Sequence, residues 1–196
     1  MDRRSLLALA AASGAAALAP GFAAAAAARG WRSILDGRSL RGWTKVGEKG
    51  TWEVVDGAVQ SVDGGSFLVS DGTYGDFELC AEVWVSDNAN SGVFIRCTNP
   101  MQISPANAYE VNLYDQRPDP SYGTGAIVNV AKVSPMPKAG GKWNVMEIRA
   151  EGEHLTVKLN GQVTVDVMDK LHAHGRIALQ GGAGTVRWRK VQIREL

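Results

Sequence analysis

The sequence predicts an all-β fold, a jelly-roll sandwich of two antiparallel sheets. Short runs of alternating apolar and polar residues recur from residue 51 to the end, and no segment between them has a helical period. The 23 glycines suit a fold with many turns. So many antiparallel strands in one small domain imply two packed sheets, each with one face in the core. One outer face is then free to curve around a ligand.

The first 29 residues are predicted to be an export signal that is not part of this fold. Paired arginines at positions 3 and 4 precede an Ala/Leu-rich stretch to Leu18 and then a tract of small residues. The arginines and the Ser5-Leu6-Leu7 that follows resemble a twin-arginine signal, and a general secretory signal is the alternative. A membrane anchor is disfavoured because the apolar run is shorter than the roughly 20 residues of a spanning helix.

Residues 30–196 are therefore expected to form one domain of a periplasmic or secreted protein, with no membrane span in the mature chain. The formal net charge of +1 gives no general attraction to nucleic acid or acidic lipid. The chain has no nucleophile elbow, phosphate loop or dinucleotide fingerprint, which argues against nucleotide and redox-cofactor enzymes.

The expected strands are bounded by Gly, Asp, Asn, Pro or Ser residues typical of turns. They are Thr51–Val55, Ala58–Ser61, Phe77–Val85, Gly92–Cys97, Tyr109–Tyr114, Gly125–Val130, Trp143–Ala150, His154–Leu159, Gln162–Val167, Arg176–Gln180 and Val186–Leu196. Asp56-Gly57 and Asn160-Gly161 each separate two runs, and these residue types accept the positive φ angles of a two-residue hairpin turn. Both are predicted to be tight hairpins.

The two cysteines allow a disulfide if neighbouring strands form a hairpin. When Phe77–Val85 pairs with Gly92–Cys97, Cys80 falls directly opposite Cys97, within reach of a bridge. Export would permit oxidation. The alternative is two small buried thiols, because a shift of one residue in register places them on opposite faces.

One strand carries the most informative pattern. In Tyr109–Asp115 the alternation places Glu110 and Asn112 on one face and the apolar residues between them on the other. The polar face is either a solvated sheet surface or a ligand-binding surface.

A family resemblance favours the ligand-binding reading. Ile34–Trp43, which reads ILDGRSLRGW, resembles the opening LFDGKSLDGW of the 3-keto-disaccharide hydrolase domain family. Further stretches resemble that family's pattern in order: Trp52–Val59, Tyr74–Leu79, Asn90–Arg96, Tyr109–Val111, Thr124–Ala126, Trp143-Asn144, Leu159–Gly161 and Ile177–Gln180. The resemblance implies a concanavalin A-like lectin/glucanase sandwich, an extracytoplasmic bacterial role, and action on sugars oxidised to a ketone at carbon 3.

The implied reaction is an elimination followed by hydration. The ketone acidifies the proton on carbon 2, so a base can remove it, and the group on carbon 1 then leaves before water adds. The site needs a carboxylate base, a positive group or metal for the enolate oxygen, and polar groups that orient the sugar. Glu110 is the first candidate for the base and Arg96 for the positive group. The alternative role of Arg96 is a structural salt bridge.

Further residues are candidates for substrate binding. Asn112 and Gln180 offer amides to sugar hydroxyls, and Tyr114 offers an aromatic platform, as do Tyr122 and Trp84. Lys158 could reach the same groove from its strand face or could be a solvated lysine. Glu82 is a competing carboxylate that could project from the same sheet as Glu110.

Cofactor use is open. No cofactor is certain, and a divalent metal is the one option considered. Asp115 ends its strand beside a turn-rich segment, where it either binds a metal or caps the turn. His172 and His174 are predicted to be surface residues because no third metal ligand lies near them in the sequence.

The chain departs from the family pattern after Gln180. Many members have a polar pair such as Asp-His there, whereas this chain has Gly181-Gly182. A groove residue that could bind a metal or carry a proton is thus expected to be missing. This keeps open a second function, a non-catalytic, lectin-like carbohydrate-binding domain, and a third, a structural envelope protein. For the first two functions the expected partner is a carbohydrate, an oxidised glucoside or disaccharide in the case of the enzyme.

Overall fold

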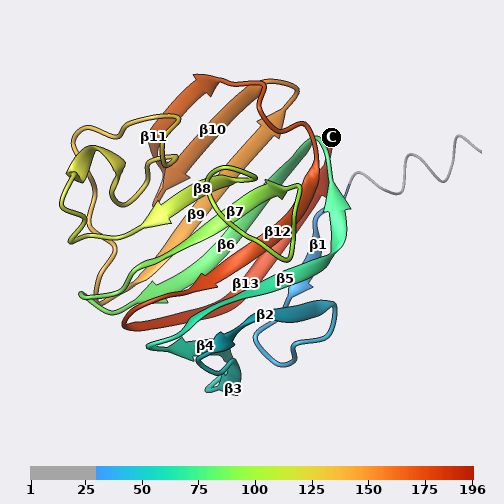
Figure 1. The fold of residues 1–196 in the computed structure, drawn as a ribbon, viewed down its shortest axis with the longest axis vertical. Helices are drawn as coiled ribbons and strands as arrows, with labels where there is room; N and C mark the ends of the chain where they lie inside the picture. Colours follow the sequence, from blue (N-terminus) through green and yellow to red (C-terminus); the bar gives the residue numbers. More distant parts are fainter. Residues whose placement is uncertain (1–29) are drawn as a thin grey trace, which may run out of the picture.

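Residues 30–196 are described by a computed structural model, and the predicted export signal lies outside the described residues. This part of the chain forms two antiparallel sheets (Figure 1). It contains no α-helix, and its one helical segment is the 3₁₀ turn η1, Pro120–Tyr122. No helix of residues 30–196 is long and apolar enough to cross a membrane. The predicted all-β sandwich is confirmed.

Sheet A has eight strands in the order β11-β10-β9-β6-β13-β4-β3, with β1 also paired to β13. Its strands are β1 (Arg32–Leu35), β3 (Glu53–Val55), β4 (Ala58–Val62), β6 (Phe77–Val85), β9 (Trp143–Glu151), β10 (His154–Leu159), β11 (Gln162–Met168) and β13 (Thr185–Glu195). Sheet B has five strands in the order β2-β5-β12-β7-β8. They are β2 (Trp43–Lys49), β5 (Gly65–Tyr74), β7 (Ser91–Cys97), β8 (Tyr109–Leu113) and β12 (Gly175–Gly181).

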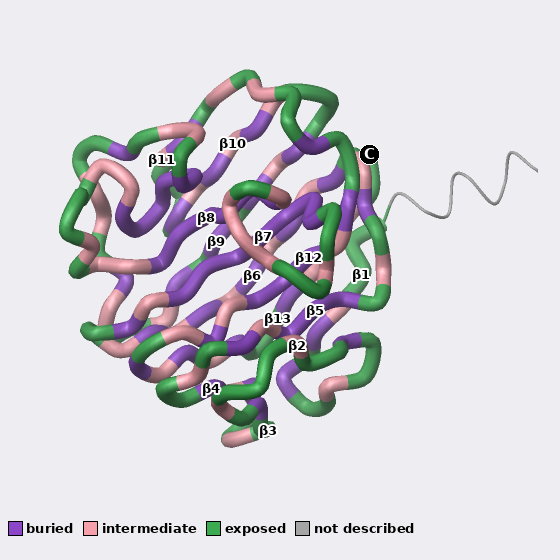
Figure 2. The backbone as a smooth tube through the Cα atoms, in the orientation of Figure 1, coloured by how far each residue is buried: buried purple, intermediate pink, exposed green. Residues whose placement is uncertain are grey.

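The main core lies between the two sheets, and Figure 2 shows buried backbone along the central strands of both. Strict alternation on β6 sends Phe77, Leu79 and Ala81 inward, while Glu78 and Cys80 stay on the outer face. Trp188 of β13 is fully buried in the same core. Large side chains of this kind supply most of the hydrophobic stabilisation.

The hairpin predictions are confirmed. Val55 pairs with Ala58 across Asp56-Gly57, and Leu159 pairs with Gln162 across Asn160-Gly161. All four turn residues have positive φ, between 49° and 80°. This is the geometry that matches the twist of a two-residue hairpin.

Some strand predictions differ from the structure. β1, β2 and β5 were not expected, because glycine, serine and aspartate inside β5 and charged residues along β2 resemble loop composition. The predicted strand Gly125–Val130 is wrong. Only Ile127 forms isolated bridges there, to Val111 and Ala131, although the surrounding loop is largely buried.

Of the two alternatives for the cysteines, the disulfide is not formed, and both cysteines are free. The hairpin on which it depended does not form, because β6 belongs to sheet A and β7 to sheet B. Cys80 lies on sheet A opposite Glu147 and Gln192, whereas Cys97 is buried on sheet B. Burial raises the pKa of both thiols, which disfavours the reactive thiolate.

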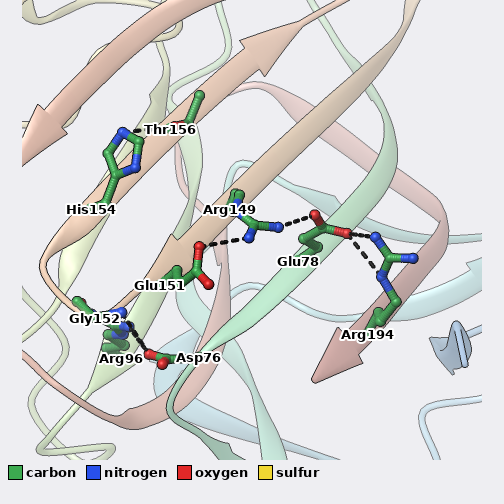
Figure 3. A network of polar contacts seen from close by, with 9 residues as sticks. All are labelled: Asp76, Glu78, Arg96, Arg149, Glu151, Gly152, His154, Thr156 and Arg194. Atoms are coloured by element: carbon green, nitrogen blue, oxygen red, sulfur yellow. Dashed lines mark hydrogen bonds and ion pairs between the residues drawn. The ribbon is translucent and has the colours of Figure 1, made fainter. Parts of the chain in front are cut away.

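Arg96 fastens one end of the sandwich. Its Nε donates to Gly75 O at 3.0 Å, and its Nη1 donates to Gly152 O at 2.7 Å and to His172 O at 3.1 Å. Its Nη2 pairs with Asp76 Oδ1 at 2.9 Å, and Figure 3 shows this pair beside Gly152. The Arg96 side chain is 1% exposed. One side chain of sheet B thus holds the β5–β6 turn, the β9–β10 turn and the loop before β12.

We expect Arg96→Met to lower the free energy of unfolding by about 3 kcal/mol or more, because it leaves buried acceptors without a donor. Arg149→Met is the matched control, since the ion pairs of Arg149 lie on the half-exposed outer face of sheet A, where solvent screens them and they contribute little to stability. Urea unfolding of both variants measures the difference. Equal losses would contradict a special role for Arg96.

Candidate functional site

Strand β8 presents Glu110 and Asn112 to the outer face of sheet B, as predicted. Tyr109, Val111 and Leu113 join the core between the sheets. Glu110 and Asn112 nevertheless are buried, so the prediction of a solvated face is wrong. Loops and neighbouring side chains cover this part of the outer face.

A second apolar cluster forms the floor beside Glu110. It consists of Val69, Phe94, Cys97, Ala108 and Ala178, with Val46, Phe67 and Ile103 packed against it. Phe94 lies directly across from Glu110 in the register of β7 and β8, and its ring meets Phe67 edge to face at 5.2 Å. A carboxyl group at this position is therefore surrounded by low-dielectric material.

Gly92 lies between two amides. It pairs with Asn112 on one side, and the register that pairs Leu179 with Val93 sets Gln180 on the other. A Cβ at position 92 would lie 2.8 Å from Val111 O, so a side chain there would collide with backbone. Position 92, between Asn112 and Gln180, is therefore restricted to glycine.

Both amides have an unpaired oxygen. Asn112 Nδ2 donates to Tyr122 O at 2.8 Å, which fixes the side chain, but Asn112 Oδ1 is buried without a donor. Gln180 Oε1 is also buried and unpartnered among the described residues. An unpaired buried acceptor costs on the order of 1–3 kcal/mol, so a ligand hydroxyl or a water that donates to it would be stabilising.

Glu110 is a buried residue whose carboxyl has no hydrogen-bonding partner in this part of the chain. The residue is 7% exposed, and no residue of 30–196 forms a hydrogen bond or ion pair with its carboxyl. Burial raises the pKa of Glu110 to about 7, and the positive charge of Arg117 opposes part of this rise. Near neutral pH the group is a mixture of acid and base, as general acid–base catalysis requires.

Arg117 is the charged residue near this site that sequence analysis missed. It follows β8 in a turn-rich loop, is half-buried, and donates its backbone N–H to Tyr114 O at 3.4 Å. Strand periodicity predicts faces but not the direction in which a loop folds back. The one available signal was that Arg117 lies only a few residues after the strand of Glu110.

Asp115 neither caps the turn that follows it nor has a free oxygen, because it holds two distant loop segments. Its carboxylate accepts hydrogen bonds from Thr124 Oγ1 at 2.6 Å, from Ala139 N at 3.0 Å and from Gly140 N at 2.9 Å. Both oxygens are engaged, which does not fit a metal ligand. Among residues 30–196, no group of three or more His, Cys, Asp or Glu residues could hold a metal ion.

The prediction that Arg96 faces the substrate is corrected. All its hydrogen bonds go to the turns and loop at the end of the sandwich, and its ion pair is with Asp76 rather than Glu110. Arg96 also has a positive φ of 52° beside a register shift in β12, so strict alternation fails at this residue.

Three further predicted groove residues lie on the other side of the sandwich. Glu82, Trp84 and Lys158 occupy the outer face of sheet A, and Glu82 pairs with Arg189 there. Alternation gives the face of a strand but not the sheet to which the strand belongs, which is why this prediction failed. Tyr114 directly follows β8 and is half-buried, so it remains a candidate platform.

The glycines after Gln180 are required by packing. A Cβ at Gly181 would lie 2.4 Å from Ser61 Oγ, and one at Gly182 would lie 2.0 Å from Asn90 O. This backbone therefore has no room for a polar pair at these positions. His172 does not repair the loss, because it is buried with its ring 5.0 Å from that of Tyr109, contrary to the predicted surface position. His174 is exposed, as predicted.

A family model described as the 3-keto-alpha-glucoside-1,2-lyase-like domain matches residues 30–194. No curated protein matches the sequence. A proposed glycosyl hydrolase from Parabacteroides distasonis is 23% identical, with a TM-score of 0.72, and the match covers 85% of this chain and 100% of that one. A second from the same organism is 17% identical, with a TM-score of 0.76, covering 91% and 98%.

The carbohydrate-binding module CBM66 from Bacillus subtilis is 21% identical, with a TM-score of 0.64, covering 79% of this chain and 96% of that one. At these identities the likeness to solved structures shows the fold alone.

The raised pKa of Glu110 predicts a pH-dependent stability. A carboxyl whose pKa is higher in the folded state stabilises fully below its unfolded pKa and loses this contribution as pH rises through about 7. Glu110→Gln removes the ionisable group. We expect it to be more stable than the unchanged protein above about pH 8, by on the order of 3 kcal/mol, with the pH-dependent part of the gain absent below about pH 4.

Urea unfolding at the two pH values measures this difference. Glu147→Gln, at an exposed position of sheet A, is the control and should show no such pH dependence. A constant difference between Glu110→Gln and the unchanged protein across this range would contradict the raised pKa.

Proposed function

Because this chain belongs to the 3-keto-alpha-glucoside-1,2-lyase-like domain family, we propose that it cleaves 3-keto-glycosides or 3-keto-disaccharides by elimination and hydration. The observation that carries the proposal is the buried, unpartnered carboxyl of Glu110, whose pKa is raised to about 7. An acidic proton beside a ketone needs a base of this strength, and the apolar residues around Phe94 lie beside this carboxyl.

The proposed first step uses Glu110 as the base. Its carboxylate takes the proton from carbon 2 of the oxidised sugar. The electron pair of that C–H bond forms a double bond between carbons 2 and 3, and the π pair of the ketone moves to its oxygen. The enolate then reforms the ketone as the bond from carbon 1 to the leaving oxygen breaks. Glu110 returns its proton to this oxygen. Water adds across the new double bond, placing a hydroxyl on carbon 1 and a proton on carbon 2.

The other residues at the site are one cation and two neutral amides, and their proposed roles differ accordingly. The enolate oxygen needs a donor or a positive group, and Arg117 is the charged residue whose field already acts on Glu110. Asn112 Oδ1 and Gln180 Oε1 are acceptors without donors, so their proposed role is to bind sugar hydroxyls. Orientation of the ring would follow from those two contacts.

The proposed location is the periplasm or the cell exterior. Its support is the sequence of residues 1–29, with paired arginines, an apolar stretch and small residues.

A second candidate function is non-catalytic carbohydrate binding. Gly181 and Gly182 favour it, because their packing leaves no room for the polar pair found in many family members. The fold likeness to a carbohydrate-binding module is consistent with this alternative. It predicts sugar binding without product.

We expect the purified protein to release 3-keto-glucose from 3-keto-trehalose or from a 3-keto-glucoside. Mass spectrometry measures this release. Glu110→Gln should reduce turnover by about 10²-fold or more while leaving sugar binding largely intact, since it removes only the base. Glu82→Gln is the matched control on the other sheet and should retain activity. Binding without release would favour the lectin-like function, and full activity in Glu110→Gln would remove Glu110 as the base.

Arg117 should control the pH dependence of the same reaction. The plot of kcat/KM is expected to rise with pH through about 7, as Glu110 loses its proton. Arg117→Gln removes a positive charge that lowers the pKa of Glu110, so its profile should move to higher pH. Arg117→Lys keeps the positive charge, so its profile should lie close to that of the unchanged protein. Coincident profiles for all three proteins would show that Arg117 does not act on the base.

A further inference from the structure

The outer face of sheet A contains a hollow that is unrelated to the site on sheet B. Its volume is about 340 Å³, and it is lined by outward side chains of β6, β9, β10 and β13 together with Trp31. Pockets of this size take small ligands such as one sugar ring. It lies on the opposite side of the sandwich from Glu110, so the following inference does not depend on the proposed reaction.

A network of ion pairs builds one wall of the hollow. Figure 3 shows Glu78 between Arg149 and Arg194. Arg149 Nη1 bonds one oxygen of Glu78, and Nε and Nη2 of Arg194 bond the other. Arg149 Nη2 also bonds Glu151 Oε2 at 2.6 Å. These contacts hold both guanidinium groups in place and use up the negative charge of Glu78, whose pKa is lowered by the two arginines despite its burial.

Two positively charged side chains of this hollow have hydrogen-bond donors that are not used. Arg194 Nη1 and Lys158 Nζ have no acceptor among residues 30–196. Glu147 faces Lys158 across β9 and β10 and lines the same hollow. The lining carries three positive and two negative side chains, and Arg149, one of the positive ones, is paired with both Glu78 and Glu151. The unused donors of Arg194 and Lys158 therefore suit an anionic group.

Trp31 adds an aromatic surface at the same hollow. Its ring lies 5.3 Å from Arg194 Cζ, and the residue is 43% exposed. The contact with Arg194 holds the indole, and the remaining exposed ring can stack on the apolar face of a pyranose. A simple anion would leave the indole unused, and a neutral sugar would leave the cations unused.

We propose that this hollow is a second binding site for a carboxylated sugar, a uronic acid unit of an acidic polysaccharide. Lys158 and Arg194 would bind the carboxylate, and Trp31 would stack against the ring. Such a site would hold the protein on an acidic polysaccharide while the face of sheet B remains free.

The test is a calorimetric titration of the protein with sodium glucuronate, with glucose and inorganic phosphate as separate arms. Glucuronate should bind about fivefold or more tightly than either, and Lys158→Gln and Trp31→Ala should each lose about fivefold in affinity. Lys190→Gln is the matched control, an exposed lysine of β13 outside the hollow. It should bind glucuronate like the unchanged protein.

Three results would overturn the inference. Glucuronate that binds no better than glucose would remove the role of the cations. Phosphate that binds as well as glucuronate, with no loss in Trp31→Ala, would reduce the hollow to a general anion site. Equal losses in Lys158→Gln and Lys190→Gln would show attraction to the overall charge of the sheet. Circular dichroism of each variant confirms that the sandwich is folded.

Discussion

The burial of strands β7 and β8 of sheet B on both faces is the constraint on which the candidate site depends. Successive side chains of a strand point to opposite faces, and every residue of β7 and β8 is buried. One face packs in the main core and the other against the smaller apolar cluster around Phe94. Polar groups on the second face are therefore desolvated, which raises the pKa of Glu110 and leaves the oxygens of Asn112 and Gln180 without donors.

On the outer face of sheet A the polar side chains are solvated and paired instead. Its charged side chains are half-exposed and pair with one another, as Glu78 does with Arg149 and Arg194. Solvent screens such pairs, so they contribute little to stability individually. The two sheets thus offer different environments to ligands. Sheet B offers an unpaired carboxyl in apolar surroundings, and sheet A offers fixed positive donors beside an indole.

The sequence allowed prediction of local features that depend on alternation and turn chemistry. The hairpins at Asp56-Gly57 and Asn160-Gly161 formed as expected, and Glu110 and Asn112 share the predicted face of β8. Features that depend on strand order could not be predicted in the same way. The chain crosses between sheets after β6, which separates Cys80 from Cys97, and again after β8, which places Lys158 on the opposite sheet from Glu110. The direction of the Arg96 side chain depends on a bulge, and the position of Arg117 near Glu110 depends on the path of a loop. Strand periodicity predicts neither.

The most direct test of the central claim is a titration of the Glu110 carboxyl by carbon-detected NMR, with Glu110→Gln used to assign its signal. A midpoint near 7 is expected, because burial without a hydrogen-bonding partner disfavours the charged form. A midpoint near the ordinary value of 4.5 would mean that the outer face of sheet B is solvated in solution. That result would contradict both the burial of Glu110 and its proposed role as a base.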